Sequence, residues 1–236
     1  MIIEQTRLSI DDRSIMHAFI AKPDQGPSPA LILLQEVFGV NHHIKDVAQR
    51  FAREGFYTIA PELFHRTAPP GYEGNYEDFR AARPHFSAIT IETLESDLNA
   101  TYSWLLSRSD VKADSIGSVG YCLGGKVSFL ANSLLPLQTA VSFYGGGIAP
   151  SLLSHCERQN GPILLVWAGL DKNILPEHYR SVSDSLRKHN KNYVEAIFSN
   201  ANHGFFCDAR SAYNTESAQQ AWSLTVSFLK TYLMIS

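Results

Sequence analysis

The chain lacks the features that mark several classes of protein. Its longest apolar runs, such as residues 30–34 and 163–168, are as long as a core strand, whereas a membrane-spanning helix needs about 20 apolar residues. The first residues do not show the basic-then-apolar pattern of a secretory signal peptide. Twenty basic residues against twenty-three acidic ones give a net charge of -3. We therefore expect no nucleic-acid partner and no membrane partner.

Cysteine is also scarce, with three residues, Cys122, Cys156 and Cys207. An odd, small number argues against a disulfide framework and favours a reducing cytosol, so we expect a cytoplasmic protein. The length of 236 residues and the hydrophobic share of 44% are those of a globular chain that needs neither a disulfide nor a metal ion to fold. We expect one domain over residues 1–236, as a monomer or homodimer.

Strand-like and helix-like segments alternate along the chain. Apolar or alternating patterns predict strands at 14–21, 30–35, 56–60, 115–121, 138–143, 162–168 and 193–198. Helical spacing of apolar residues predicts helices at 44–52, 94–106, 123–134, 179–186 and 222–233. This alternation predicts an α/β fold, with a mostly parallel central sheet and helices on both faces. Residues 65–90 are irregular and are interpreted either as a lid or as a plain long loop.

The active site of such a sheet lies outside the carboxyl ends of its strands. At one of these ends stands Cys122, in the sequence Gly120-Tyr121-Cys122-Leu123-Gly124. The spacing is that of a nucleophile elbow, G-x-S-x-G, with cysteine in the place of serine. A thiol there points into a cleft at a helix N-terminus, which favours the thiolate. The backbone N–H of Leu123 is placed to stabilise an oxyanion. The alternative is a small buried cysteine beside a glycine-lined helix start.

Two further polar residues follow later strands. Asp171 comes after the strand at 162–168, and His203 comes after the last strand. An acid can orient a histidine and stabilise its imidazolium. Each residue has a structural interpretation by itself, as a turn aspartate or as one of nine histidines. Their order with Cys122 is nucleophile, acid, histidine, which is the α/β-hydrolase order.

Glu36 directly follows the strand at 30–35. A carboxylate at the exit of a core strand is costly unless it meets solvent or a partner, so Glu36 is either a site residue or a solvated loop acid. The histidines at 42, 43, 65 and 85 lack metal-ligand spacing with acids or cysteines. We predict that they are surface residues and that the protein binds no metal.

Together these segments resemble the dienelactone hydrolase family. The resemblance rests on residues 35–41 (Q-E-x-F-G-x-N), 55–64, 119–125 (with G-Y-C-x-G-G), 144–145, 169–171 and 202–205, in this order. It runs from about the second strand to the end of the chain, and the first and third of these motifs are highly specific together. The resemblance implies an α/β-hydrolase core without a large cap domain.

The resemblance also implies a reaction and its residues. Cys122 would be the nucleophile, His203 the general base and then acid, and Asp171 its orienting partner. Glu36 would contact the resting thiol and help to deprotonate it. Backbone N–H groups of Leu123 and Val37 would form the oxyanion hole. The implied reaction is hydrolysis of a small ester or lactone through an acyl-thioester, without a metal or an organic cofactor.

One departure from the family concerns the substrate. Dienelactone hydrolases carry an arginine four residues after the histidine, to hold a substrate carboxylate, and this chain has Cys207 there. Arg80, Arg83 and Arg210 are candidates to supply the charge, because a guanidinium meets a carboxylate in two hydrogen bonds. Each is equally interpretable as a solvated surface arginine, and the substrate need not be dienelactone.

Two other functions stay open at this point. The chain could be a ligand-binding or regulatory module on a hydrolase fold, because a fold does not fix a function. It could also be a redox sensor, because an accessible cysteine of low pKa is readily oxidised. Such a sensor would need a resolving cysteine close to Cys122.

Overall fold

The structure is a computed structural model that describes residues 1–234. It has an α/β fold, in which eight strands make a mixed, mostly parallel sheet flanked by helices. The chain divides into two compact units, Met1–Ile116 and the residues from Gly117 onwards, and each is described by itself. Whether they make one domain, as expected above, stays a prediction. Over the described residues, no helix combines the length and the apolar character needed to cross a membrane.

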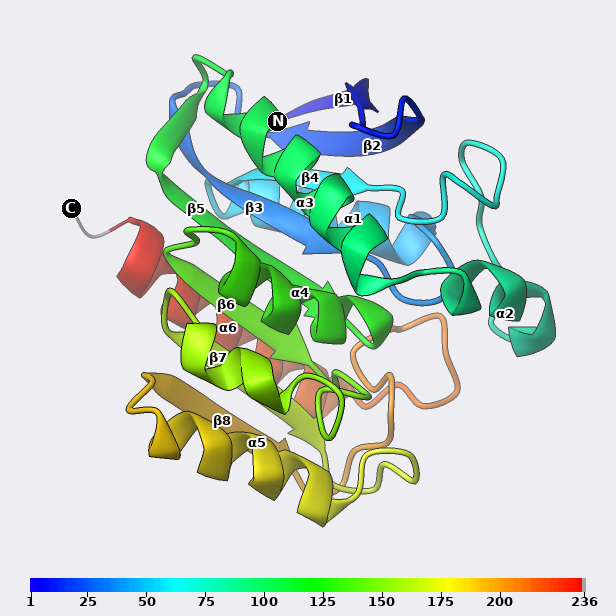
Figure 1. Ribbon diagram of the computed structural model, residues 1–236, viewed down its shortest axis with the longest axis vertical. Coiled ribbons are helices and arrows are strands. Elements are labelled where there is room, and N and C mark those ends of the chain that lie inside the picture. Colours follow the sequence, from blue (N-terminus) through cyan, green and yellow to red (C-terminus); the bar gives the residue numbers. More distant parts are fainter. Residues whose placement is uncertain (235–236) are drawn as a thin grey trace. The chain divides into compact units, whose positions relative to one another are not determined.

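The first unit contains the amino-terminal strands. These are β1 (Ile2–Ser9), β2 (Ile15–Lys22), β3 (Ser28–Leu34), β4 (Tyr57–Pro61) and the start of β5 (Val111–Tyr121). The order of the first four is β1-β2-β4-β3. β1 pairs with β2 and β2 with β4 in antiparallel fashion, while β3 and β4 are parallel. Helices α1 (His42–Arg53) and α3 (Ile91–Leu106) lie on opposite faces of these strands (Figure 1).

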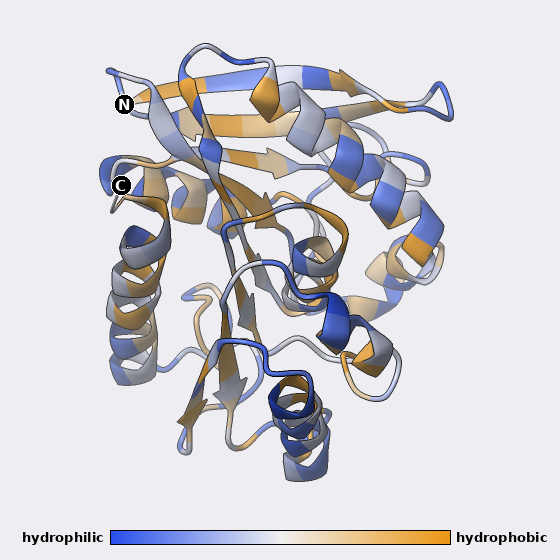
Figure 2. Cartoon of the chain, turned by 60° about the vertical axis from the view of Figure 1, so that its left-hand side comes forward, coloured by the Kyte–Doolittle hydropathy of each residue, from blue (hydrophilic) through white to orange (hydrophobic). Residues whose placement is uncertain are grey.

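The burial of these elements follows their sequence. β3 is buried at every residue, as its unbroken apolar run predicts. In α1 the Asn41 side chain accepts a hydrogen bond from the Ile44 N–H at 3.2 Å and so starts the helix. The apolar face of α1 is buried, and Gly55 follows the helix with a φ of 96°. In Figure 2 the strands are largely hydrophobic, whereas α5 in the second unit carries a mainly hydrophilic surface.

The second unit contains four parallel strands in the order β5-β6-β7-β8. Its further elements are α4 (Leu123–Leu134), β6 (Thr139–Phe143), the 3-10 helix η1 (Leu153–Arg158), β7 (Ile163–Ala168), α5 (Pro176–Lys188), β8 (Tyr193–Phe198) and α6 (Thr215–Leu233). Helices α4 and α5 lie on one face of these strands and α6 on the other (Figure 1). The carboxyl ends of all four strands therefore meet at one edge, where the predicted site residues follow them.

Three elements differ from the expectations drawn from the sequence. β1, η1 and the helix α2 (Phe79–Ser87) were not predicted. Residues 65–90 are more ordered than a plain loop: besides containing α2, they are tied to the loop after β3. The Asn41 side chain donates to the Tyr76 hydroxyl at 2.7 Å, and the Gly74 N–H donates to the Phe38 carbonyl at 2.8 Å. A role for this segment as a lid stays a prediction.

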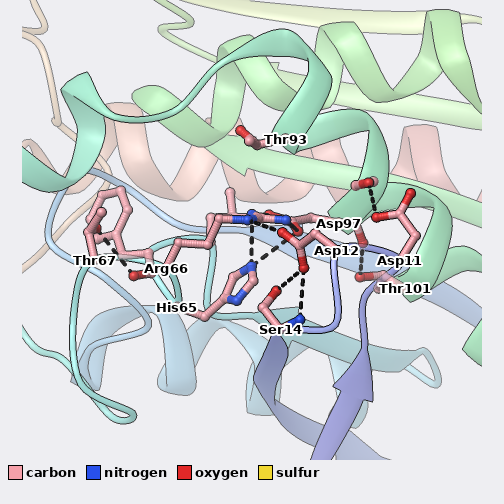
Figure 3. Close-up of polar contacts among 12 residues, drawn as sticks. Asp11, Asp12, Ser14, His65, Arg66, Thr67, Thr93, Asp97 and Thr101 are labelled. Carbon is pink, nitrogen blue, oxygen red and sulfur yellow. Dashed lines mark hydrogen bonds and ion pairs between the residues drawn. The ribbon is translucent and has the colours of Figure 1, made fainter.

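The prediction of surface positions was wrong for two of the four histidines. His43 is buried, and the His65 side chain is 3% exposed. His65 is buried because it belongs to a polar cluster of the first unit, which Figure 3 shows. Its Nε2 lies 3.1 Å from Asp97 Oδ1 and 2.9 Å from Arg66 Nη1. A buried ring of this kind needs partners that sequence spacing does not reveal.

Asp97 is the centre of this cluster. Its side chain is 1% exposed, and its Oδ2 accepts a hydrogen bond from Arg66 Nη1 at 2.9 Å, while its Oδ1 forms an ion pair with Arg66 Nη2 at 2.9 Å. Arg66 also donates to Asp12 at 2.7 Å, and Asp12 accepts from the Ser14 N–H at 2.8 Å. The cluster thus joins three parts of the first unit: the β1–β2 turn, the segment after β4, and α3 (Figure 3).

We predict that Asp97→Ala lowers the free energy of unfolding by about 3 kcal/mol, because it leaves the Arg66 charge and the His65 ring without their buried partner. Urea unfolding followed by circular dichroism measures the loss. Asp184→Ala is the matched control, because the Asp184–Arg187 pair is exposed at both side chains and such pairs contribute little. Equal urea midpoints for wild type and Asp97→Ala would contradict this account of the cluster.

Candidate active site

The candidate site is built at the bend where β5 passes into α4, in the second unit. Cys122 stands between the last residue of β5 and the first of α4, with a φ of 55° and a ψ of -114°. Non-glycine residues rarely adopt this conformation, and it costs on the order of 1–3 kcal/mol. The surrounding hydrogen bonds hold it: the Cys122 N–H donates to the Phe143 carbonyl at 3.0 Å, and the Cys122 carbonyl accepts from Gly125 at 3.0 Å.

The glycines of the bend are required by close approach of the backbone. A Cβ at Gly120 would lie 1.9 Å from the Gly124 carbonyl oxygen, and one at Gly125 would lie 2.3 Å from the Phe143 carbonyl oxygen. No larger residue fits at either position without moving the strand or the helix. The geometry confirms the strand-to-helix elbow expected from the spacing of Gly120 and Gly124. It leaves the Cys122 side chain partly exposed rather than packed in the core.

Asp171 lies in the turn after β7 and is held in a fixed orientation. It is 7% exposed. Its Oδ1 accepts the backbone N–H groups of Asn173 at 2.8 Å and Ile174 at 3.2 Å. The other oxygen, Oδ2, is thereby left to point at a different partner.

That partner is His203, in the loop after β8, whose Nδ1 lies 2.6 Å from Asp171 Oδ2. The two loops are adjacent because β7 and β8 are paired and because the backbone segments that directly follow these strands contact each other. The Leu170 N–H donates to the Ala201 carbonyl at 2.9 Å, and a Cβ at Gly169 would lie 2.6 Å from the Ser199 Cα. The two side chains, 32 residues apart in sequence, are thus brought together by strand pairing.

Cys122 also acts electrostatically on His203, whose other partner is Asp171. Burial acts to lower the pKa of His203, but the charge of Cys122 and the hydrogen bonds with Asp171 and Cys122 outweigh it and raise that pKa to about 10. Burial acts to raise the pKa of Asp171, but the bond and the charge of His203 lower it below its ordinary value. His203 therefore keeps its proton to a higher pH than a free imidazole, beside the carboxylate of Asp171.

The Tyr144 ring packs beside the imidazole of His203, and the Phe205 ring packs against that of Tyr144. This packing was not recognised from the sequence. The Tyr144 ring lies 5.0 Å from the His203 ring and 5.5 Å from that of Phe205. Tyr144 is buried and has a φ of 37°, an uncommon value for a residue with a side chain. The three glycines that follow Tyr144 at the end of β6 were the available sequence signal for an unusual backbone at this position.

Glu36 and Val37 belong to the first unit, at the end of β3. Glu36 is fully buried, which excludes the interpretation as a solvated loop acid. The Gln35 side chain donates to the Glu36 carbonyl at 3.3 Å, and Glu36 pairs with Gly39 in an isolated bridge. Val37 is buried as well. Their roles beside Cys122 stay predictions.

The three arginines considered for substrate binding lie in different surroundings. Arg80 and Arg83 are exposed on α2 in the first unit. Arg210 is half-buried in the second unit, and its guanidinium packs against Gly204, where a Cβ would lie 2.2 Å from Nη1. Among these arginines, Arg210 is the one that the structure places on the loop of His203.

The three cysteines also differ in how far they are exposed. Cys122 is partly exposed, whereas Cys156 and Cys207 are buried. Burial raises the pKa of the Cys156 thiol, which makes it a poor nucleophile. The partly exposed thiol is thus the one at the strained bend.

The strand order and the strand-to-helix bend at Cys122 are those of the α/β-hydrolase fold. Comparison with known proteins agrees. Residues 16–233 match the dienelactone hydrolase family. A protein of Synechocystis sp. provisionally named carboxymethylenebutenolidase is 33% identical, over 98% of each chain. An Escherichia coli protein of the same provisional name is 32% identical, over 92% of this chain and 83% of its own.

A solved structure shows the same likeness. The crystal structure of a Klebsiella pneumoniae protein, provisionally described as a dienelactone hydrolase, has a TM-score of 0.88 at 29% identity and covers 98% of this chain and all of its own. The chain belongs to the dienelactone hydrolase family, and it is a dienelactone hydrolase-like hydrolase. The resemblance seen in the sequence is thereby confirmed.

We predict that Cys122→Ala lowers the pKa of His203, because the variant removes the charge and the hydrogen bond of Cys122 that act to raise it. Asp171→Asn should lower it as well, for the same electrostatic reason. NMR titration of the histidine ring protons measures both shifts, and His203→Gln identifies the signal by its loss. A His203 pKa that stays at about 6.5 in wild type, or that does not change in Cys122→Ala, would contradict the assigned contacts.

Proposed function

We propose that the protein hydrolyses a small carboxylic ester or lactone through an acyl-thioester on Cys122. The observation that carries the proposal is the strained, partly exposed Cys122, which acts on the pKa of His203, together with the 2.6 Å contact of His203 with the buried carboxylate of Asp171. A nucleophile, a base that contacts it, and an acid that orients the base are the parts that acyl transfer requires.

In the first half of the reaction His203 holds the proton of the Cys122 thiol, and the Cys122 sulfur attacks the carbonyl carbon of the substrate. The carbonyl electron pair moves onto oxygen and forms a tetrahedral intermediate. When the C–O bond to the alcohol breaks, protonated His203 gives its proton to the leaving oxygen. Asp171 stabilises the imidazolium during this exchange, as its short bond to His203 supports.

The oxyanion needs hydrogen-bond donors that are fixed before the reaction. Leu123 is the first residue of α4, where a backbone N–H has no acceptor within the helix. We assign it as one donor, with the Val37 N–H as the other. In the second half, His203 removes a proton from water, the resulting hydroxide attacks the thioester, and the sulfur leaves with its electron pair.

Glu36 is assigned to assist deprotonation of Cys122. Its full burial supports a role in the site, because it excludes that of a solvated loop acid. We propose this role of Glu36 together with that of the Val37 N–H as a donor, since both residues follow β3.

The name carboxymethylenebutenolidase, carried provisionally by the relatives, supports a lactone or ester of small size. We propose Arg210 as an arginine that holds a substrate carboxylate, because it lies on the His203 loop; Arg80 and Arg83 are the other candidates. We further propose a protein that acts in the reducing cytoplasm as a monomer or homodimer, since a nucleophilic thiol requires the reduced state.

We predict that Cys122→Ala lowers kcat/KM for 4-nitrophenyl acetate by roughly a thousandfold or more, because members of a catalytic unit act together. Cys122→Ser should be weaker than wild type, because a serine hydroxyl depends more on an activated base. Release of nitrophenolate is the measurement. Cys156→Ala is the matched control, because that thiol is buried and lies in η1.

The same experiment separates hydrolysis from the alternatives. Hydrolysis by Cys122→Ala at the wild-type rate would reject the nucleophile. Binding of esters and lactones by wild type without turnover would instead favour a ligand-binding module on this fold.

A further inference from the structure

Tyr144 stands at the end of β6, the strand of the second unit to which the proposed reaction assigns no residue. β5 leads to Cys122, β7 to Asp171 and β8 to His203. Tyr144 directly follows β6 and is fully buried. Because β6 lies between β5 and β7 in the sheet, Tyr144 lies between the strand ends that carry the proposed nucleophile and the proposed acid.

The backbone of Tyr144 is fixed by both neighbouring strands. Its N–H donates to the Val166 carbonyl of β7 at 2.7 Å, and the carbonyl of the preceding Phe143 accepts the Cys122 N–H at 3.0 Å. The φ of 37° is one that side-chain-bearing residues rarely adopt, at a cost on the order of 1–3 kcal/mol. This strained turn, tied to β7 and to the Cys122 bend, sets the direction in which the Tyr144 side chain points.

Other aromatic rings hold the Tyr144 ring in place. Its centroid lies 5.5 Å from that of Phe205 and 5.9 Å from that of Phe143, with interplanar angles of 68° and 76°. These are edge-to-face arrangements, a favoured geometry for aromatic pairs. The Tyr121 ring lies 6.4 Å away. A ring packed on several sides presents a fixed surface to its remaining neighbour, the imidazole of His203.

The imidazole of His203 needs such a surface, because Asp171 holds only one of its atoms. The bond from Asp171 Oδ2 reaches Nδ1 at 2.6 Å. The terminal torsion of a histidine side chain is broad, so a hydrogen bond at one atom does not by itself fix the plane of the ring. The Tyr144 centroid lies 5.0 Å from that of the imidazole, with an interplanar angle of 55°. This packing is a second restraint, independent of the hydrogen bond.

We propose that Tyr144 is a positioning residue, whose ring fixes the plane of the His203 imidazole so that one nitrogen stays on Asp171 while the other serves Cys122. The inference rests on the proposed function and concerns its general base. Tyr144 acts through His203 and takes no part in bond making or breaking. Proton transfer requires hydrogen-bond geometry between the base and the group it serves, so a small change in the ring plane is costly.

The test separates the ring of Tyr144 from its hydroxyl. Tyr144→Leu and Tyr144→Met remove the ring, and methionine fills irregular space where leucine fits poorly. Both should lower kcat for 4-nitrophenyl acetate by roughly tenfold to a hundredfold. They should lower kcat/KM about equally, as expected when an interaction of the transition state is lost. Tyr144→Phe keeps the ring and should keep most of the activity. Phe228→Leu, which removes a buried ring from α6, is the matched control.

A second measurement distinguishes positioning from a general loss of structure. Asp171 and Cys122 act to raise the pKa of His203, and an imidazole that turns away loses part of both interactions. In Tyr144→Leu and Tyr144→Met, NMR titration should therefore show the His203 pKa falling towards the ordinary value of about 6.5. Tyr144→Phe and Phe228→Leu should keep the wild-type value.

Wild-type kcat and an unchanged His203 pKa in either folded variant without the ring would overturn the proposal. Tyr144→Phe as impaired as Tyr144→Leu would overturn it as well, because the hydroxyl and not the ring would then be the group that matters. Failure of the proposed function gives a different result, since Cys122→Ala would then hydrolyse the ester as fast as wild type.

Discussion

The candidate site depends on one backbone constraint, the strained conformation of Cys122 between β5 and α4. The bend leaves the thiol partly exposed, while the N–H and the carbonyl of Cys122 itself are both hydrogen-bonded. It is tolerated because Gly120 and Gly125 let the strand, the helix and the end of β6 approach more closely than side chains would allow. Strain concentrated at one residue and compensated by its neighbours is typical of a functional position rather than of a structural one.

The second requirement is the placement of the acid and the histidine that accompany this sulfur. Each of the three residues is held by a different strand exit: Cys122 by β5, Asp171 by β7 and His203 by β8. Asp171 uses one oxygen to cap its own turn, so that the other is fixed on His203. The parallel pairing of β7 and β8 therefore has a chemical consequence, because it brings an acid and a base together without any local sequence signal.

The sequence was sufficient to predict the parts of the fold that depend on local pattern. β8 and α4 have the predicted bounds, since a strand and a helix with clear apolar periodicity differ from their flanking turns. β1 was missed because its residues are mostly exposed, so it carries no core pattern. The burial of His65 and the contact of Tyr144 with His203 depend on partners far away in the chain. The elbow at Cys122 was predictable because backbone segments that approach this closely leave no room for a side chain. Glycine is therefore required at these positions, and it can be recognised in the sequence.

The central claim is that the Cys122 sulfur carries the acyl group during turnover. Acid quenching during hydrolysis of a slowly deacylating aryl ester, followed by mass spectrometry of the intact protein and its peptides, tests it directly. The account predicts one added acyl mass, located on the peptide at Cys122 and released by neutral hydroxylamine, as expected for a thioester. Steady turnover with the acyl group on another residue, or with no covalent adduct at any time, would contradict it.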